Sequence, residues 1–266
     1  MRKSKLQKIS PVLMIAIALI FFYLPIVLTI IFSFNSSRSL TSWSGFSLQW
    51  YQNLFHDRSI ISAVTTTVSI ALISTVIATI VGTISAIGIS NSKPIIKEIV
   101  LNINNLPILN PDIVTAISLM LLFTTLSITK GFMTMLLAHI AFCIPYVILS
   151  VLPKLRRLDP NIAEAAMDLG ATPWQALIKV IVPQIMPGII SGALIAFTMS
   201  FDDFVISYFV TGNGVRNISI LVYTMSKRIN PTINALSSIM ILLVTVILIA
   251  INIIPLFKKK ERTVLE

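Results

Sequence analysis

The residues of this sequence that could take part in chemistry are the acidic side chains inside its apolar stretches. Asp112 lies in "NPDIVTAISLMLLF", and Asp202 and Asp203 are adjacent in "SFDDFVISYFV". A carboxylate at the centre of a bilayer costs at least roughly 2.5 kcal/mol, so these groups are expected to face a pore or a partner chain. Phe204 and Tyr208 follow the acidic pair. Carboxylates beside aromatic faces suit transient contacts with cations, so these five residues form a candidate pathway for a cation.

A structural role for the aspartates stays open beside that interpretation. Each carboxylate could instead serve in packing or in contacts with another subunit. Successive positions of an α-helix differ by about 100°, so Asp202 and Asp203 cannot both point straight into one pore. One of the two is therefore a candidate structural acceptor.

Other reactive residue types are too few for a catalytic or metal site. The single cysteine, Cys143, lies in an apolar segment and excludes an internal disulfide and a cysteine-based metal cluster. His56 and His139 are far apart, and a lone histidine in an apolar run is more often a hydrogen-bonded packing residue than a ligand. No nucleophile, base and acid set is present, so an enzyme is not expected. The chain also lacks a Gly-rich phosphate loop, so any nucleotide must be bound by another protein.

Composition defines the class of protein that must position these residues. The chain has 266 residues, of which 56% are hydrophobic and 11% are charged, and its mean hydropathy is +0.92. A soluble domain would be about a quarter charged, so we expect a single polytopic membrane domain over residues 1–266, in contact with membrane lipid. The net charge of +10 does not indicate nucleic-acid binding, because Lys and Arg lie at the ends of apolar runs and no RNA-binding motif is present.

Apolar runs predict an all-α protein with six transmembrane helices. A crossing needs roughly 20 apolar residues. The candidate spans are 11–34, 60–90, 108–127, 132–152, 187–210 and 234–257. The first follows a basic start as a signal peptide would, but it is too long and lacks a small-residue cleavage site, so we expect it to be retained.

The third candidate span is interrupted on its N-terminal side. "NINNLPILNPDIV" contains four asparagines and two prolines, so residues 95–106 are a candidate separate helix near the cytoplasmic surface. Asn110 and Pro111 are expected to start the span, as its N-cap and first helical residue.

The distribution of basic residues predicts the orientation. With six spans, both termini lie on one side together with the loop 153–186. That side would hold most of the Lys and Arg, and the other side would hold only Arg38, Arg58, Lys130, Arg216, Lys227 and Arg228. The positive-inside rule therefore predicts a multi-pass protein of the cytoplasmic membrane with both termini in the cytoplasm.

The loop 153–186 predicts two short helices. Asp159 and Pro160 are a suitable helix start, and the apolar residues that follow have the spacing of one helical face, namely Ile162, Ala165, Ala166 and Leu169. Gly170 lies where a left-handed residue ends a helix. Thr172 to Gln175 match a capping box with Pro173 at the first position.

The second short helix is expected to stop before the fifth span. Its apolar residues recur with the same spacing, at Trp174, Leu177, Ile178 and Ile181, and Pro183 and Pro187 are expected to end it. These features predict a rigid helix-turn-helix at the cytoplasmic surface. An amphipathic loop that lies on the lipid surface is the alternative.

The spacing within this loop resembles the EAA loop of ABC importer permeases. The family pattern has Glu-Ala-Ala, then three variable residues, a glycine and a closing proline, which correspond here to 164–166, Gly170 and Pro183. Val180 and Val182 replace the usual Ile and Leu. In that family the loop is a coupling helix that docks into the ATPase subunit. The resemblance implies coupling roles for Glu164, Ala165, Ala166, Asp168, Gly170 and Trp174.

Further stretches are similar to permease subunits of polyamine (spermidine and putrescine) ABC importers. They include "FNSSR", "WSGFSLQWY", "HIAFCIPYV" and "SFDDFVISYFVTG". The resemblance implies the type I (MetI-like) permease fold, a second permease, an ATPase dimer that binds ATP, and an extracytoplasmic polyamine-binding protein. It implies no cofactor and no metal in this chain.

Two other functions stay open at this point. The same scaffold could import an amino acid, ferric ion or molybdate, although an anion would fit intramembrane aspartates poorly. An ion-driven secondary transporter is the second alternative, but such proteins often contain inverted repeats, and none is evident here.

Overall fold

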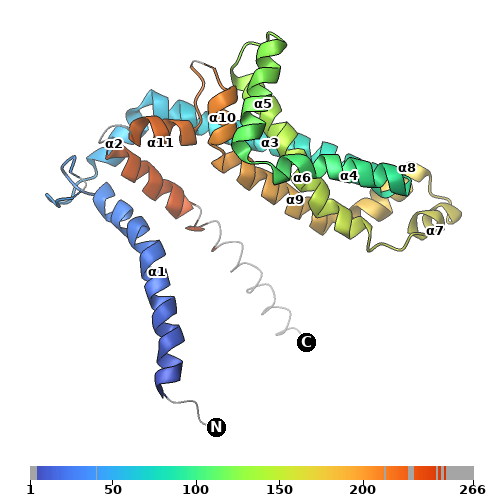
Figure 1. The fold of residues 1–266 in the computed structure, drawn as a ribbon, viewed down its shortest axis with the longest axis horizontal. Helices are drawn as coiled ribbons and strands as arrows, with labels where there is room; N and C mark the ends of the chain where they lie inside the picture. The colour runs from blue at the N-terminus through green and yellow to red at the C-terminus, as the bar shows by residue number, and fades with distance from the viewer. Residues whose placement is uncertain are drawn as a thin grey trace. The chain divides into compact units, whose positions relative to one another are not determined.

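The computed structural model describes residues 5–39, 41–212, 214–226, 231–243, 245–246 and 249. They are almost entirely helical, which confirms the predicted all-α class (Figure 1). The long helices are α1 (Lys5–Ser33), α3 (Arg58–Ser90), α4 (Pro94–Leu109), α5 (Asp112–Thr125), α6 (Phe132–Leu155) and α9 (Val182–Asp202). The short ones are α2 (Gln49–His56), α7 (Ile162–Asp168), α8 (Pro173–Ala176), the π-helical turn η1 (Leu177–Ile181), α10 (Val205–Val210) and α11 (Ile218–Ser226).

The chain divides into two compact units. One contains residues 1–60 and 222–266, and the other contains residues 61–221. In the first unit, the buried side chain of Asn35 holds the loop after α1, because it donates to the carbonyl oxygens of Ser39 and Ser42. The indole nitrogen of Trp50 in α2 donates to the Asn35 carbonyl at 2.7 Å, so α2 is tied to the end of α1.

Helix α6 is the centre of the second unit. It packs against α9 and α4, and its middle supplies much of the buried core, including Ala138, Cys143, Val147 and Val151. The neighbouring helices approach it at glycines. A Cβ at Gly82 of α3 would lie 2.7 Å from Cβ of Val147, and one at Gly188 of α9 would lie 2.7 Å from Cγ of Lys154. Side chains at these two positions would force the helices apart.

Four helices of the described residues are long and apolar enough to cross a membrane. They are Val12–Ser33, Arg58–Ser90, Phe132–Leu155 and Pro173–Asp202. The pair of α4 and α5 makes a fifth if it counts as one broken span, because the two helices meet at an angle of 105°. Of the predicted sixth span, 234–257, the structure describes an apolar helix over Thr232–Leu243, and most of the remainder lies outside the described residues.

In the structure, the predicted third span begins differently from expectation, and Pro111 is the cause. The separate helix expected over 95–106 is confirmed as α4. Asn110 is not the N-cap of α5, however, because it ends α4 with extended backbone (φ −79°, ψ 144°), and Pro111 takes the N-cap position. A proline disfavours helical backbone in the residue before it, so the chain bends here. The 14 residues of α5 rise only about 21 Å, which is less than a bilayer core.

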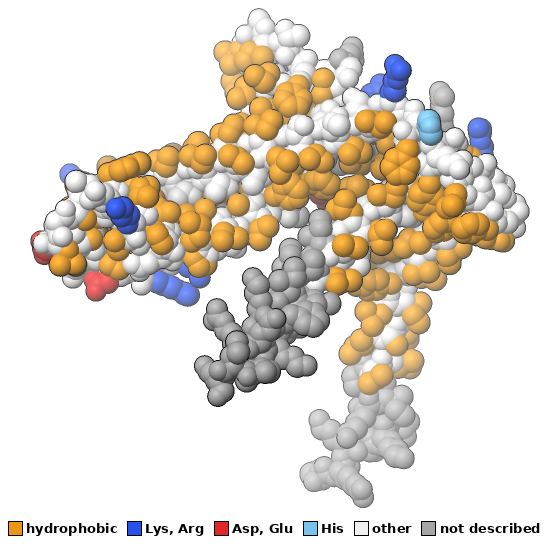
Figure 2. Space-filling model, turned by 180° about the vertical axis from the view of Figure 1, so that it is seen from behind, with side chains coloured by type: hydrophobic (Ala, Val, Ile, Leu, Met, Phe, Trp, Pro, Cys, Tyr) orange, Lys and Arg blue, Asp and Glu red, His pale blue; other side chains and the backbone are white. Residues whose placement is uncertain are grey.

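The surface of the second unit is largely apolar. Figure 2 shows hydrophobic side chains along its flank, whereas acidic and basic side chains gather at the end formed by α7 and α8. Exposed large hydrophobic residues of the second unit include Ile95, Ile103, Leu109 and Ile190. This distribution matches helices that face lipid or other transmembrane chains.

Candidate functional site: an acidic cavity and an exposed helical turn

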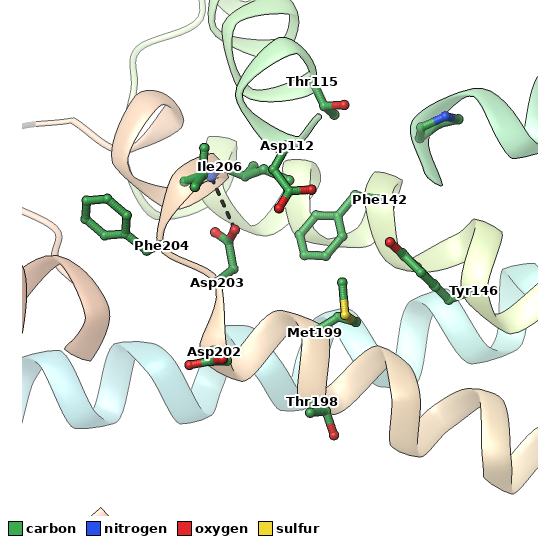
Figure 3. Close-up of a pocket in the computed structure, with 12 residues that line it drawn as sticks. Asp112, Thr115, Phe142, Tyr146, Thr198, Met199, Asp202, Asp203, Phe204 and Ile206 are labelled. Atoms are coloured by element: carbon green, nitrogen blue, oxygen red, sulfur yellow. Dashed lines mark hydrogen bonds between the residues drawn. The ribbon is translucent and has the colours of Figure 1, made fainter. Parts of the chain in front are cut away.

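A cavity of about 300 Å³ in the second unit brings most of the predicted pathway residues together (Figure 3). Asp112 comes from the start of α5, Asp202 from the end of α9, and Asp203 and Phe204 from the segment before α10. Four residues separated by up to some ninety positions therefore line one space.

The bend at Pro111 and the end of α9 place the carboxylates. Asp112 lies in the first turn of α5, where a negative charge interacts favourably with the helix dipole. The side chains of Asp112 and Asp202 are exposed, and neither forms a hydrogen bond or ion pair with any residue that the structure describes. They are available to a cation that enters the cavity.

Asp203 has a different environment. Its Oδ1 accepts from the backbone nitrogen of Ile206 at 3.2 Å, and its Oδ2 accepts from that of Ser207 at 2.7 Å. The backbone of Asp203 is extended (φ −64°, ψ 128°), so α9 ends and α10 begins anew. The range of the predicted span 187–210 is therefore divided between α9 and α10, because the Asp203 carboxylate caps the next helix. In Figure 3 the Asp202 carboxylate is directed away from that of Asp203.

Aromatic side chains complete the lining. Phe142 and Tyr146 of α6 and Phe204 line the cavity, whereas Tyr208 does not, and in Figure 3 the Phe204 ring is directed away from the carboxylates of Asp112 and Asp203. Tyr208 packs against Phe204, with ring centroids 5.4 Å apart, and lines a second, wider cavity with Lys130 and Arg216. The predicted set is thus divided, with four members at the acidic cavity and Tyr208 outside it.

Sequence reasoning missed Phe142 and Tyr146. A signal was present, because His139, Phe142 and Tyr146 recur three and four residues apart and therefore share one face of α6. The interpretation of His139 as a hydrogen-bonded packing residue is confirmed. It is buried, its Nδ1 lies 2.7 Å from Oγ of Ser200, and its Nε2 lies 2.9 Å from Oγ of Ser207.

A metal centre is not formed in the described part of the chain. No group of three or more His, Cys, Asp or Glu side chains there is arranged to hold a metal ion.

The second candidate site is the turn between α7 and α8. Gly170 adopts the predicted left-handed conformation (φ +88°). Its N–H donates to the carbonyl of Met167 at 2.9 Å, and the N–H of Ala171 donates to that of Ala166 at 3.1 Å. These two bonds form a Schellman motif, which satisfies the last carbonyls of α7 and fixes the angle of the turn.

The start of α7 and the helix after the turn partly differ from expectation. Asp159 and Pro160 precede α7, which begins at Ile162, and the Asp159 carboxylate accepts from the N–H of Asn161. The capping box of Thr172 and Gln175 is confirmed by reciprocal bonds of 3.3 and 3.1 Å.

The expected stop at Pro183 and Pro187 is wrong. Helical structure continues from Pro173 through η1 to Asp202. Pro183 lies in the first turn of α9, after the π-helical turn, where its missing N–H is least disruptive. The turn is thereby joined to the acidic cavity by one helical rod of 30 residues.

Apolar side chains at this turn are left uncovered. No residue of α7 is buried, Leu169 is 91% exposed, and Trp174 is 69% exposed. The predicted apolar face of the second helix is split, because Leu177 and Ile181 are half-buried while Trp174 and Ile178 are exposed. Glu164 and Asp168 are also exposed. Such a mixed surface on a fixed turn is suited to docking against another protein.

Comparison with known proteins gives the chain a family. Residues 78–257 match the model of the family described as binding-protein-dependent transport system inner membrane component. The spermidine/putrescine transport system permease protein PotC of Escherichia coli K12 is 37% identical over 244 residues, which cover 91% of this chain and 92% of that protein. The putrescine transport system permease protein PotI of the same organism is 39% identical, with coverage of 83% and 82%.

A solved structure supports the fold. A chain from the crystal structure of a bacterial ABC transporter involved in the import of the acidic polysaccharide alginate superposes with a TM-score of 0.72. It is 13% identical and covers 96% of this chain and 97% of that chain. The similarity shows a shared fold of an ABC importer's transmembrane chain, at a level of identity that carries no information on substrate.

Proposed function

This chain belongs to the binding-protein-dependent transport system inner membrane components, and we propose that it is the permease subunit of an ATP-driven importer of the polyamines spermidine and putrescine. As a family member it is a non-catalytic, multi-pass permease of the inner membrane. Membership also implies that an ATPase and an extracytoplasmic binding protein act with it.

The acidic cavity is the observation that carries the substrate class. Asp112 and Asp202 offer carboxylates without a partner among the described residues, and Phe142 and Tyr146 offer aromatic rings. A polyamine carries several ammonium groups joined by short apolar chains. Carboxylates and aromatic faces in one space match both features of such a cation. The names of the similar permeases support the same substrate class.

The exposed turn is the proposed docking point for the ATPase. Glu164, Ala165, Ala166, Asp168, Gly170 and Trp174 would contact it. The Schellman motif at Gly170 keeps the turn rigid, and the rod from Pro173 to Asp202 connects it to the cavity. A movement imposed at the turn would therefore be transmitted along this helix toward Asp202. We infer that two ATPase subunits bind this chain and a second permease.

The length of the helical segment from Pro173 to Asp202 supports a topology in which the turn is cytoplasmic. Thirty helical residues rise about 45 Å, which exceeds the roughly 30 Å of a bilayer core. The first turns from Pro173 would therefore extend into the cytoplasm, and the cavity at Asp202 would lie in the outer half of the membrane. Both termini are proposed to be cytoplasmic.

A competition assay tests the substrate. The chain is produced with its partner permease, ATPase and binding protein, and uptake of radiolabelled spermidine is measured. Unlabelled spermidine and putrescine should compete, whereas an amino acid, ferric citrate and molybdate should not. Competition by one of the latter three, without competition by polyamines, would assign the scaffold to that substrate instead.

A further inference from the structure

We propose that His139 is a positioning residue, which holds the break between α9 and α10 so that the Asp203 carboxylate acts at the acidic cavity. The expected effect of His139 on transport rests on the proposed polyamine function, whereas its effect on the position of Asp203 does not. His139 does not line the cavity. It would act through the residues on either side of the break.

Both ring nitrogens of His139 are engaged, one on each side of the break. Nδ1 bonds Ser200 in the last turns of α9, and Nε2 bonds Ser207 in the first turn of α10. A neutral imidazole has one donor and one acceptor nitrogen, and a serine hydroxyl can take either role. The histidine on α6 therefore fixes the distance between two helices that local sequence alone leaves free to hinge.

The same ring approaches the carboxylate itself. Nε2 of His139 lies 3.5 Å from Oδ2 of Asp203, the atom that accepts the N–H of Ser207. Ser207 is thus contacted by both His139 and Asp203. A shift of the imidazole would move the first turn of α10, and the carboxylate that caps this turn would move with it.

Asn217 closes the arrangement from the other side. Its Nδ2 donates to the carbonyl oxygen of Asp203 at 2.8 Å and to Oγ of Ser207 at 2.9 Å, and its Oδ1 accepts from the N–H of Ile220. Ser74 of α3 extends the chain of contacts, because its Oγ lies 3.0 Å from that of Ser200. His139, Ser200, Ser207, Asn217 and Ser74 are all buried.

A buried polar network of this kind has one preferred geometry. Every member has a partner, and moving one of them would leave a donor or acceptor unsatisfied away from water. The break contains neither proline nor glycine in "SFDDFVIS". Its geometry therefore depends on the Asp203 cap and on the His139 bridge.

Two conservative variants each keep one of the two hydrogen bonds of His139 and remove the other. An asparagine amide reaches the position of a histidine Nδ1, and a glutamine amide reaches that of Nε2. His139→Asn should keep the contact to Ser200 and lose that to Ser207, whereas His139→Gln should do the opposite. Because Ser207 lies on the Asp203 side, Gln should preserve the cavity better than Asn.

The primary measurement does not need a transported substrate. Thr115 lines the cavity, so Thr115→Cys in a Cys143→Ser background gives one thiol there. In the purified complex, the labelling rate of this thiol by a cationic methanethiosulfonate is divided by its rate with a neutral one. Asp203→Asn should lower this ratio by about threefold, since a nearby carboxylate attracts the cationic reagent. His139→Asn should lower it similarly, and His139→Gln should leave it near the background value.

Thr134→Val is the matched control. Thr134 is buried on the same helix. Its hydroxyl lies 2.9 Å from the carbonyl oxygens of Val210 and Gly131 and accepts from the N–H of Gly131, so this variant removes bonds at the start of α6 and between α6 and α10, away from the break. The labelling ratio of Thr134→Val should equal that of the protein that carries only Cys143→Ser and Thr115→Cys. Ser207→Ala and Ser200→Ala repeat the test without changing the histidine, and only Ser207→Ala should lower the ratio.

Transport supplies the second readout. The KM for spermidine should rise about fivefold in His139→Asn, the equivalent of one lost hydrogen bond between uncharged groups, with less change in His139→Gln. If the parent complex does not transport polyamines, the proposed function fails while the labelling ratio still tests the positioning. An unchanged ratio in both His139→Asn and Ser207→Ala overturns the inference. The inference is also overturned if the Asn and Gln variants lose assembled complex to the same extent and the labelling ratio of the complex that remains is unchanged.

Discussion

Nε2 of His139 in α6 lies 3.5 Å from Oδ2 of Asp203 in the segment between α9 and α10, although the two residues are 64 positions apart in sequence. The contact lies at the point where α9 ends and α10 begins. All three aspartates line the cavity, but the Asp203 carboxylate accepts hydrogen bonds from protein groups, whereas those of Asp112 and Asp202 have no partner among the described residues. The three intramembrane aspartates are therefore expected to respond differently to substitution.

Asp112→Asn and Asp202→Asn should impair transport without impairing assembly. Each change keeps side-chain size and removes a charge that no described residue balances. Spermidine uptake should fall roughly tenfold, which corresponds to about 1.4 kcal/mol of a partly screened charge contact. Uptake and the amount of complex recovered with its partners are measured together. Normal uptake in the double variant would remove both residues from the pathway.

Asp203→Ala should destabilise the protein. It removes the acceptor for the N–H groups of Ile206 and Ser207, and loss of a helix cap costs about 1–2 kcal/mol. The thermal unfolding midpoint of the purified complex should decrease by a few degrees. Asp203→Asn keeps one side-chain oxygen and should decrease it less. Equal midpoints for Ala, Asn and the parent protein would contradict the capping role.

Gly170→Val should uncouple ATP hydrolysis from transport. The left-handed backbone at φ +88° costs a residue with a side chain about 1–2 kcal/mol, so α7 and α8 should change their relative angle. Gly88→Val is the matched control, because a Cβ at either glycine meets no atom within 4 Å and only Gly170 has positive φ. ATPase stimulation by the binding protein should be lost in Gly170→Val and kept in Gly88→Val. Stimulation in both would exclude the turn from coupling.

The proposed orientation predicts which thiols a membrane-impermeant reagent reaches in intact cells. In the Cys143→Ser background, Gly214→Cys should be labelled from outside. Gly170→Cys should be labelled only after the membrane is permeabilised. External labelling at position 170 would reverse the topology and with it the docking of the ATPase.

Gly82→Ala should weaken the packing of α3 on α6. The added Cβ would lie 2.7 Å from Cβ of Val147, and overpacking of this kind costs typically about 1–3 kcal/mol. The unfolding midpoint should decrease, and Val147→Ala should restore part of the loss in the double variant, because it removes Cγ1 of Val147, which the added Cβ would meet at 2.8 Å. Additive effects of the two changes would show that the helices do not meet at this point.

Local features of this protein were determined by its sequence alone. The apolar runs fixed the class of protein, because bilayer insertion depends on the hydrophobicity of consecutive residues. The left-handed Gly170 and the capping box of Thr172 and Gln175 were predictable for a similar reason. Each depends on backbone groups within about one turn of the chain, so neighbouring residues suffice to specify it.

Tertiary structure decided the rest of the site. The His139 bonds join residues 61 and 68 positions apart, and no local pattern specifies which serine meets which nitrogen. Pro183 and Pro187 did not end their helix. A proline removes one helical hydrogen bond, whereas in apolar surroundings ending the helix would leave several backbone groups unsatisfied. The helix ends instead at Asp202, where the Asp203 side chain and the buried network supply replacement partners, and this is where the cavity forms.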